Sequence, residues 1–234
     1  MLARYQRIVV LTGAGISRSA GLPTYRGPGG LWNNPANVEL NTIEALRDRR
    51  SDVCEMFWNF RAGIGRAQPT IAHHALAAFA RALKPPATLQ IITQNIDGLH
   101  QRAGSFGVCE YHGSLTRWRC EICEVELEPP WLDQDPSPPV HCGEVMRPSV
   151  VLFGEMIPVA AERTAKHALR DCDLFVAIGT SGTVAPASSF VRWARLDHAR
   201  TVLLNLETFD AAAEQFTDVE LGTADELVPK WFSS

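Results

Sequence analysis

Ile8-Val9-Val10-Leu11, followed by Gly13-Ala14-Gly15, is the stretch that decides the fold. The continuous apolar run predicts a strand buried on both faces, and the glycines predict a tight turn into a helix that starts near Ser17. Such a turn also allows the backbone to approach a pyrophosphate closely. Arg18 stands where the dinucleotide fingerprint has its third glycine, so a tight turn without a ligand is the alternative.

Four further apolar runs repeat the pattern of this first strand. They cover residues 89–92, 150–153, 174–178 and 202–204, and helical patterns at 161–169 and 187–196 lie between some of them. Strands that alternate with helices are typical of a parallel, doubly wound sheet. The sequence therefore predicts an α/β fold with a Rossmann-like domain.

Two insertions interrupt this alternation. Residues 31–83 look mainly helical, with Pro69 and Thr70 starting a helix at Ile71, whereas residues 117–146 contain cysteines and many prolines without clear periodicity. We expect residues 1–30, 84–116 and 147–234 to form the Rossmann-like domain. Residues 31–83 and 117–146 would form a small module with a helical part and a cysteine-containing part.

The overall composition is that of an ordinary globular protein. The 234 residues are 46% hydrophobic and 21% charged, and a net charge of −4 offers no electrostatic footprint for nucleic acid. No stretch approaches the roughly 18 apolar residues of a membrane span, and the chain runs from Met1 into a strand-like segment without a signal peptide. We therefore expect a cytoplasmic protein that binds neither membranes nor nucleic acid, and we make no prediction of its oligomeric state.

The six cysteines are more typical of thiols or metal ligands than of a disulfide framework in such a protein. Only Cys120 and Cys123 show the spacing of a ligand pair.

Polar side chains follow the apolar run at 89–92. Gln94, Asn95 and Asp97 come directly after it, at the strand end where ligands of open α/β sheets bind. They could hydrogen-bond ribose hydroxyls and a carboxamide, but capping of the next turn by Asn95 and Asp97 is the alternative. His112 follows in Tyr111-His112-Gly113 and could supply a base. The remaining histidines are interpreted as structural: His73, His74, His100, His141, His167 and His198.

The segment after the first glycine turn has an unusual composition. Gly21-Leu22-Pro23-Thr24-Tyr25-Arg26-Gly27 should interrupt the helix after about one turn and form a loop that carries one arginine. A mobile loop over a cofactor suits that composition, and a surface loop with a solvated Arg26 is the alternative.

Taken in order, these motifs resemble those of the sirtuins, which are NAD-dependent protein-lysine deacylases. The resemblance covers the chain nearly from end to end. The matching strings are Gly13-Ala14-Gly15-Ile16-Ser17, Gly21-Leu22-Pro23-Thr24-Tyr25-Arg26-Gly27, Gln94-Asn95-Ile96-Asp97, His112-Gly113, Arg147-Pro148, Phe153-Gly154-Glu155, Gly179-Thr180-Ser181 and Asn205. Within the family, the chain is most similar to the bacterial class related to desuccinylases with a Tyr-x-x-Arg motif.

The resemblance implies that NAD, the co-substrate, binds between the two domains. The implied cofactor contacts are Gly13, Ala14, Gly15, Ser17, Gly179, Thr180 and Ser181 around the phosphates, Tyr25 and Arg26 on the loop, Gln94, Asn95, Ile96 and Asp97 at the nicotinamide half, and Asn205, Glu207 and Ala224 at the adenosine half.

The resemblance also implies a reaction and a substrate. The acyl-lysine carbonyl oxygen attacks C1′ of the nicotinamide ribose, nicotinamide leaves, and His112 serves as the general base toward a ribose hydroxyl. The implied catalytic residues are His112 and Asn95, the latter at the nicotinamide ribose. The products are lysine and O-acyl-ADP-ribose. Val151, Phe153, Gly154 and Glu155 match the segment that pairs by its backbone with an acyl-lysine protein or peptide.

Two sites depart from the family pattern. Sirtuins usually hold a structural zinc with two Cys-x-x-Cys pairs, and here Cys120, Cys123 and Cys142 match three ligands while Pro139 occupies the place of the remaining cysteine. A zinc ion with an unassigned fourth ligand is one expectation, and three thiols without metal are the other. His141 lies next to Cys142, but adjacent ligands are geometrically awkward.

The second departure concerns the acyl group. Trp58 and Arg61 occupy the Tyr and Arg positions of the acid-reading motif, so the phenol is lost and the guanidinium is kept. We expect deacetylation as the main activity, and desuccinylation or demalonylation is the less favoured expectation. An NAD-dependent ADP-ribosyltransferase or NAD hydrolase is the main alternative. Two further alternatives are less favoured. The intact His112 argues against a nucleotide-sensing module, and Arg18 argues against a hydride-transfer dehydrogenase.

Overall fold

The computed structural model describes residues 2–27, 29–129, 137–180, 185–207 and 214–233. Its main feature is a six-stranded sheet in which every pair of neighbours is parallel. In spatial order the strands are β3 (Cys109–Glu110), β2 (Thr88–Thr93), β1 (Arg7–Thr12), β9 (Leu174–Ile178), β10 (Arg200–Asn205) and β11 (Asp218–Leu221). This order is that of a doubly wound, Rossmann-like sheet, so the predicted fold class is confirmed.

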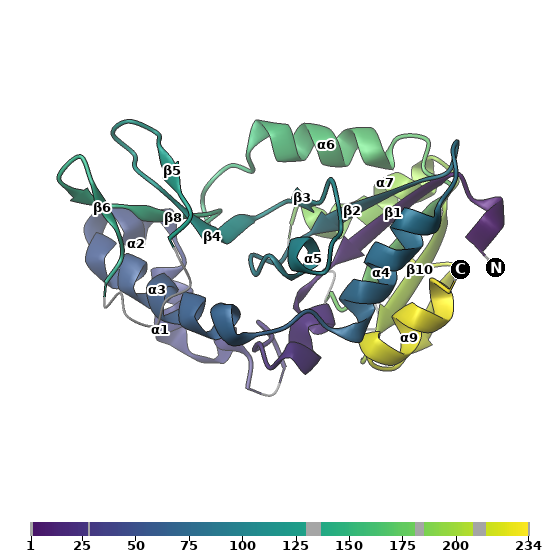
Figure 1. Cartoon of the computed structure of the whole chain (residues 1–234), viewed down its shortest axis with the longest axis horizontal. Helices are drawn as coiled ribbons and strands as arrows, with labels where there is room; N and C mark the ends of the chain where they lie inside the picture. Colours follow the sequence, from purple (N-terminus) through teal and green to yellow (C-terminus); the bar gives the residue numbers. More distant parts are fainter. Residues whose placement is uncertain (1, 28, 130–136, 181–184, 208–213, 234) are drawn as a thin grey trace.

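Helices cover both faces of this sheet (Figure 1). One face packs against α4 (Ile71–Ala82) and α9 (Ala224–Trp231), and the other packs against α6 (Val159–Leu169) and α7 (Phe190–Leu196). Alternate residues of β1 enter the two cores: Ile8 and Val10 join the first, and Val9 and Leu11 join the second. Burial on both faces explains why this strand is a continuous apolar run.

Shorter elements connect these layers. They are the 3₁₀ helices η1 (Leu2–Arg4), η2 (Ala14–Ala20) and η4 (Ala187–Ser189), and the one-turn helix α5 (Leu99–Arg102). Among the helices in the described part of the chain, none combines the length and the apolar character needed to cross a bilayer.

The rest of the chain forms a small module at the end of the molecule away from both termini (Figure 1). Its helices are η3 (Leu31–Asn33), α1 (Pro35–Leu40), α2 (Ile43–Asp48) and α3 (Arg50–Arg66). They pack on an antiparallel sheet of β5 (Glu126–Leu127), β4 (Gly113–Arg119) and β8 (Arg147–Val150). A separate hairpin joins β6 (Val140–His141) and β7 (Glu144–Val145).

The structure corrects the assignment of the apolar run at 150–153. We expected it to be a strand of the parallel sheet, but Val150 ends β8 in the antiparallel sheet, and Phe153 makes an isolated parallel bridge to Thr42. Val150 and Leu152 are buried in the core of the small module rather than under the large sheet. An apolar run reports burial, and it does not say which of two cores buries it.

Helix α4 begins where the sequence predicts. The Thr70 side chain accepts a hydrogen bond from the His73 amide, and the His73 ring accepts one from the Thr70 amide, which completes a capping box. We placed this helix in the small module, but Ala72, Leu76 and Phe79 pack in the core under the large sheet. We therefore propose that the boundary of the large domain lies before residue 70 rather than after residue 83.

Candidate functional site

Two glycine turns meet at the centre of the sheet, where β1 and β9 run side by side. The Gly13 amide donates to the Ile178 carbonyl (3.0 Å) and the Gly15 amide donates to the Gly179 carbonyl (2.9 Å). A Cβ atom on Gly15 would lie 2.6 Å from the Gly179 Cα, and Gly179 itself has a φ of +59°. Glycine is therefore required here by contact between the two turns, in addition to any ligand.

This position is the topological switch point of the sheet, because the chain leaves β1 and β9 in opposite directions. Open α/β sheets bind their ligands in the crevice at that point. A cavity of about 840 Å³ lies there and continues between the large domain and the small module. Its size is within the range of small-molecule and cofactor sites.

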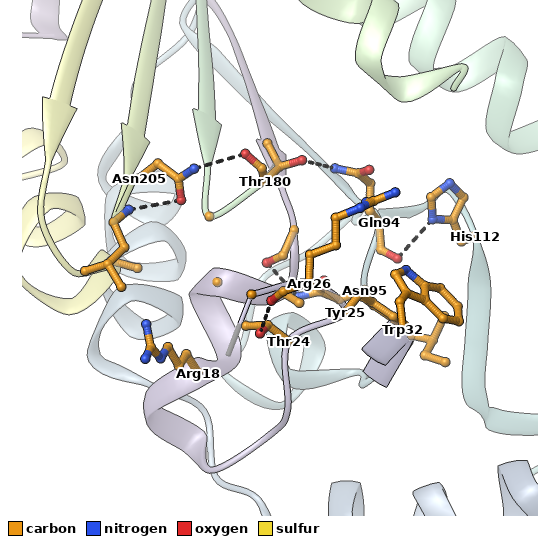
Figure 2. Close-up of a pocket in the computed structure, with 18 of the residues that line it drawn as sticks. Arg18, Thr24, Tyr25, Arg26, Trp32, Gln94, Asn95, His112, Thr180 and Asn205 are labelled. Carbon is orange, nitrogen blue, oxygen red and sulfur yellow. Dashed lines mark hydrogen bonds between the residues drawn. The ribbon is translucent and has the colours of Figure 1, made fainter. Parts of the chain in front are cut away.

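Figure 2 shows the cavity running from Asn205 and Thr180 at one end to His112 and Trp32 at the other. At the first end, the Asn205 side-chain amide donates to the Thr180 carbonyl (3.2 Å) and its oxygen accepts from the Leu206 amide (3.0 Å). Gln94 donates to the Thr180 hydroxyl (2.9 Å) and so links the ends of β2 and β9. These bonds hold the polar wall of the cavity in place.

Most of the predicted cofactor residues line this cavity. Those that do are Gly13, Ala14, Gly15, Tyr25, Arg26, Gln94, Asn95, Ile96, Gly179, Thr180, Asn205, Glu207 and Ala224. Ser181 lies outside the described residues. Ser17 and Asp97 were expected to touch the cofactor but are not among the lining residues.

Asn95 faces the cavity from a buried position, with 5% of its surface exposed. Its amide nitrogen donates to the Gly13 carbonyl (3.1 Å) and to the Ser17 hydroxyl (3.2 Å). Its oxygen Oδ1 is buried and has no hydrogen-bond partner among the described residues. A buried polar atom without a partner is costly, so an acceptor held in this state fits a ligand that donates to it.

Ser17 and Asp97 support Asn95 from below. The Ser17 hydroxyl donates to Asp97 (2.7 Å), whose other oxygen accepts from the Leu99 amide (2.9 Å). The contacts of Asp97 therefore match the alternative in which it caps the following turn. Burial raises the pKa of the Asp97 carboxyl, and the hydrogen bonds from Leu99 and Ser17 only partly oppose this effect.

His112 lines the cavity near Gln94, as Figure 2 shows. Its Nδ1 lies 3.1 Å from the Gln94 carbonyl oxygen, which can only accept, so we assign the ring proton to Nδ1. Nε2 is then the basic nitrogen. Burial lowers the pKa of His112, and the bond to the Gln94 carbonyl opposes this in part, so the neutral ring is the favoured form near neutral pH.

The segment after the glycine turn is a loop, as predicted. The 3₁₀ helix η2 ends at Gly21, whose φ is +80°, and Thr24, Tyr25, Arg26 and Gly27 line the cavity. Tyr25 stacks on Trp32 with ring centroids 5.0 Å apart, and Trp32 in turn packs 5.4 Å from Phe153. Trp32 was missed in the sequence, because nothing in its spacing distinguishes it from a core aromatic residue.

The predicted substrate residues divide into two groups. Val151, Phe153, Gly154 and Glu155 line the cavity, whereas Trp58 and Arg61 do not. The Arg61 guanidinium lies 4.8 Å from the centroid of the Trp58 ring, donates to the Pro129 carbonyl, and is part of a side chain only 4% exposed. Phe57 is the residue of α3 that lines the cavity, and periodicity alone gives no reason to prefer it to its neighbour.

A candidate metal centre lies in the small module. The ligand atoms of Cys120, Cys123, His141 and Cys142 are all within 4.8 Å of one another. His141 Nδ1 lies 3.3 Å from the Cys123 and Cys142 sulfurs, and these sulfurs are 3.7 Å apart. Tetrahedral zinc bonds of about 2.0–2.3 Å place ligand atoms at about these separations, so the four residues fit a zinc ion.

The hairpin between β6 and β7 explains how adjacent residues both reach this centre. Cys142 and Gly143 form its two-residue turn, with φ values of +51° and +84°. The left-handed turn brings the Cys142 sulfur within 3.3 Å of the His141 ring, so on this backbone two adjacent residues face one candidate centre. Pro139 instead accepts the Met146 amide through its carbonyl (2.8 Å).

Comparison with known proteins places this arrangement in a family. Residues 13–186 match the SIR2 (Sir2 family) domain. An NAD-dependent protein deacylase of Ralstonia nicotianae is 40% identical over 209 residues, which cover 86% of this chain and 81% of that protein.

Two solved structures are also similar. One is a Sir2 homolog–NAD complex, with a TM-score of 0.84 and 34% identity over 99% of this chain and 90% of that one. The other is a complex of Sir2 with a p53 peptide and NAD⁺, with a TM-score of 0.81 and 28% identity over 98% of this chain and 93% of that one. On this evidence, the chain belongs to the Sir2 family.

Proposed function

We infer that the chain is an NAD-dependent protein deacylase, as its relatives are named. The observation that carries the residue assignment is that His112 and Asn95, whose Oδ1 has no partner among the described residues, line the same cavity. One is a base with a lowered pKa, and the other is a buried acceptor without a donor. Such a pair suits a ligand whose hydroxyl groups must be held and then deprotonated.

We propose that NAD lies along the cavity, with its adenosine half near Asn205 and its nicotinamide half near Asn95. NAD supplies an ADP-ribosyl group that accepts the acyl group when nicotinamide leaves. Asn95 accepts a hydrogen bond through Oδ1, His112 takes the hydroxyl proton on Nε2, and Gln94 keeps the ring oriented. Tyr25 of the loop, stacked on Trp32 of η3, would help to exclude water from this end once NAD is bound.

The experiment that tests this function is a product analysis. Incubation with NAD and an acetyl-lysine peptide should release nicotinamide, the free lysine peptide and O-acetyl-ADP-ribose in equal amounts. Release of nicotinamide with only free or protein-bound ADP-ribose would instead support the hydrolase or ADP-ribosyltransferase alternative.

We propose that neutral acyl groups are preferred over acidic ones. Phe57, Val150 and Leu152 line the cavity and belong to the apolar core of the small module, so this wall offers no charge. Arg61, the residue expected to pair with a carboxylate, is instead stacked on Trp58 and bonded to the Pro129 carbonyl. The Tyr-x-x-Arg reading of this class therefore does not transfer to the side-chain arrangement seen here.

A panel of acyl-lysine peptides measures this preference. We expect kcat/KM for a succinyl-lysine peptide to be at least about tenfold below that for the acetyl-lysine peptide, since an unpaired carboxylate against an apolar wall costs more than about 1.4 kcal/mol. The free acids of the acyl groups serve as inhibitor controls at equal ionic strength. Equal values for the two peptides would contradict the proposal and return Arg61 to the acyl site.

We propose that zinc, when bound, is held by Cys120, Cys123, His141 and Cys142, and that it stabilises the small module. Replacing His141 by alanine should weaken zinc retention by more than about tenfold, an effect at least as large as that of losing a second-shell partner. Competition with a chromophoric chelator measures this, and the Co²⁺-loaded protein should lose its tetrahedral absorption bands.

His167→Ala is the matched control, because that histidine is exposed on α6. His141→Cys should restore retention, since a fourth thiolate also completes a tetrahedral site. Unchanged zinc retention in His141→Ala would show that the fourth ligand lies elsewhere.

We also propose a cytoplasmic location. None of the six cysteines, all of which lie in the described residues, forms a disulfide, and this suits a reducing compartment. Cell fractionation with an antibody against the chain tests it.

A further inference from the structure

The side chain of Arg147 bridges the two ends of residues 147–155, the segment that we assign to binding of the substrate peptide. Arg147 is 0% exposed, and all five of its N–H groups have acceptors. These acceptors are Pro148 O (3.3 Å, from Nε), Glu155 Oε1 and Glu121 Oε1 (2.6 and 3.4 Å, from Nη1), and Glu155 Oε2 and Val150 O (2.9 and 3.0 Å, from Nη2). The guanidinium therefore ties the start of the segment 147–155 to its end.

Glu155, at the end of this segment, bonds both to Arg147 and to the Leu152 backbone. Besides its two bonds to Arg147, its carboxylate accepts from the Leu152 amide (2.8 Å), and its own amide donates to the Leu152 carbonyl (3.0 Å). Burial would raise the pKa of this carboxyl, but the bonds from Arg147 and Leu152 outweigh that effect and hold the pKa below its usual value. The pair is thus ionised and joined by two parallel, charge-assisted hydrogen bonds.

These contacts use most of the backbone hydrogen-bonding groups between residues 150 and 154. The Val150 carbonyl and the Leu152 amide are used by Arg147 and Glu155, and the Val151 amide donates to the His112 carbonyl (2.9 Å). Phe153 exchanges backbone hydrogen bonds with Asn41 and Ile43. The Val151 carbonyl and the Gly154 amide have no hydrogen-bond partner among the described residues, and both residues line the cavity.

Gly154 shows how closely this backbone is held. Its φ is +87°, and a Cβ atom there would lie 2.8 Å from the Ile43 side chain. The segment is therefore clamped between α2 and the Arg147–Glu155 pair. Because the Val151 amide is bonded to His112, the same segment also touches the residue that we assign as the base.

We propose that Arg147 and Glu155 are a positioning pair for the acyl-lysine peptide. By occupying the Val150 carbonyl and the Leu152 amide, they fix the backbone so that the Val151 carbonyl and the Gly154 amide point to a peptide that adds as an extended strand. The inference rests on the proposed function, since it assumes that a peptide binds here. Neither side chain touches the reacting atoms.

If the pair were purely structural, its loss should lower stability and weaken peptide and NAD binding alike. A buried ion pair is weak evidence for stability, because desolvation offsets most of the attraction between the charges. Glu121 adds a third carboxylate, from the turn between Cys120 and Cys123, and it also pairs with Arg50 (2.6 Å). Arg147 thus also contacts the turn of the candidate metal centre, so the test must separate a loss of stability from a loss of peptide binding.

The test is a pair of conservative variants, Glu155→Gln and Arg147→Lys. We expect each to raise the KM for an acetyl-lysine peptide at least tenfold, to leave the KM for NAD within twofold, and to weaken peptide binding measured by calorimetry without NAD. Glu126→Gln is the matched control, because Glu126 lies in the same antiparallel sheet and accepts from the Ser149 hydroxyl (2.7 Å). It should behave as the wild type does.

Two results would overturn the pair. One is an unchanged peptide KM and affinity in Glu155→Gln and Arg147→Lys. The other is a parallel loss for peptide and NAD with a lower melting temperature, which is the signature of a structural role. Failure of the proposed function is a separate outcome, since the wild type itself would then neither bind nor turn over the acyl peptide.

Discussion

Replacing His112 by alanine should reduce deacylation by about 10²–10⁴-fold, the usual contribution of a positioned general base. The fold should remain, because the His112 side chain lines the cavity and its hydrogen bond is to the backbone carbonyl of Gln94. The NAD affinity should change little, since Asn205, which we assign to the adenosine half, lies at the other end of the cavity from the ring (Figure 2). Single-turnover rates with saturating NAD and acetyl-peptide measure the effect.

The pH profile gives an independent reading of the same base. Burial lowers the pKa of His112, so the neutral form should persist below the ordinary histidine value of about 6.5. In the wild type, kcat/KM should therefore hold as the pH falls through that value and decline only below it, as the ring becomes protonated. His74→Ala is the control, because His74 is exposed on α4. Near wild-type turnover in His112→Ala would remove the assignment.

Replacing Gly15 by alanine should abolish most NAD binding. The new Cβ would lie 2.6 Å from the Gly179 Cα and 2.9 Å from the Gly179 carbonyl oxygen, and both are backbone atoms that no rotamer change can move. The turns after β1 and β9 must then separate, at a cost of about 1–3 kcal/mol to folding. Because both turns line the cofactor cavity, we expect the Kd for NAD to rise at least about tenfold, as measured by calorimetry.

Gly63→Ala is the matched control for this substitution. Gly63 lies inside helix α3, and a Cβ there would meet nothing within 4 Å. The change should stabilise the protein by about 0.5–1 kcal/mol, because alanine loses less conformational freedom in a helix, and it should leave NAD binding unchanged. If Gly15→Ala bound NAD as tightly as Gly63→Ala does, the contact between the two turns would not control the site.

The local parts of the fold could be predicted because short segments carry their own signals. The β1 run is apolar throughout because both of its faces are buried, and Thr70 caps α4 through contacts within one turn of helix. The loop after Gly21 follows from a glycine that ends η2 in the left-handed region. Each of these features depends on residues close together in the sequence, so the pattern and its physical cause coincide.

The predictions that failed depend on contacts between segments that lie far apart in the sequence. The run at 150–153 is buried by the small module, and α4 is buried by the large sheet, so both were assigned to the wrong core. Arg61 is held by the Trp58 ring and by Pro129, 68 residues further along the chain. His141 and Cys142 face the same candidate metal centre on a turn in which Cys142 has a positive φ. No spacing rule contains those contacts.

The sequence by itself determined which chemistry is present: a glycine turn after a buried strand, polar residues after the next strand, and a histidine beyond them. These depend on residue type and order, and resemblance extends them along the chain. Only the tertiary structure decided which side chains face the cavity. Asn95 and His112 line it, Ser17 and Asp97 support Asn95 without lining it, and Phe57 lines it while Trp58 and Arg61 do not. The reason is physical, because orientation is set by packing between segments that lie far apart in sequence.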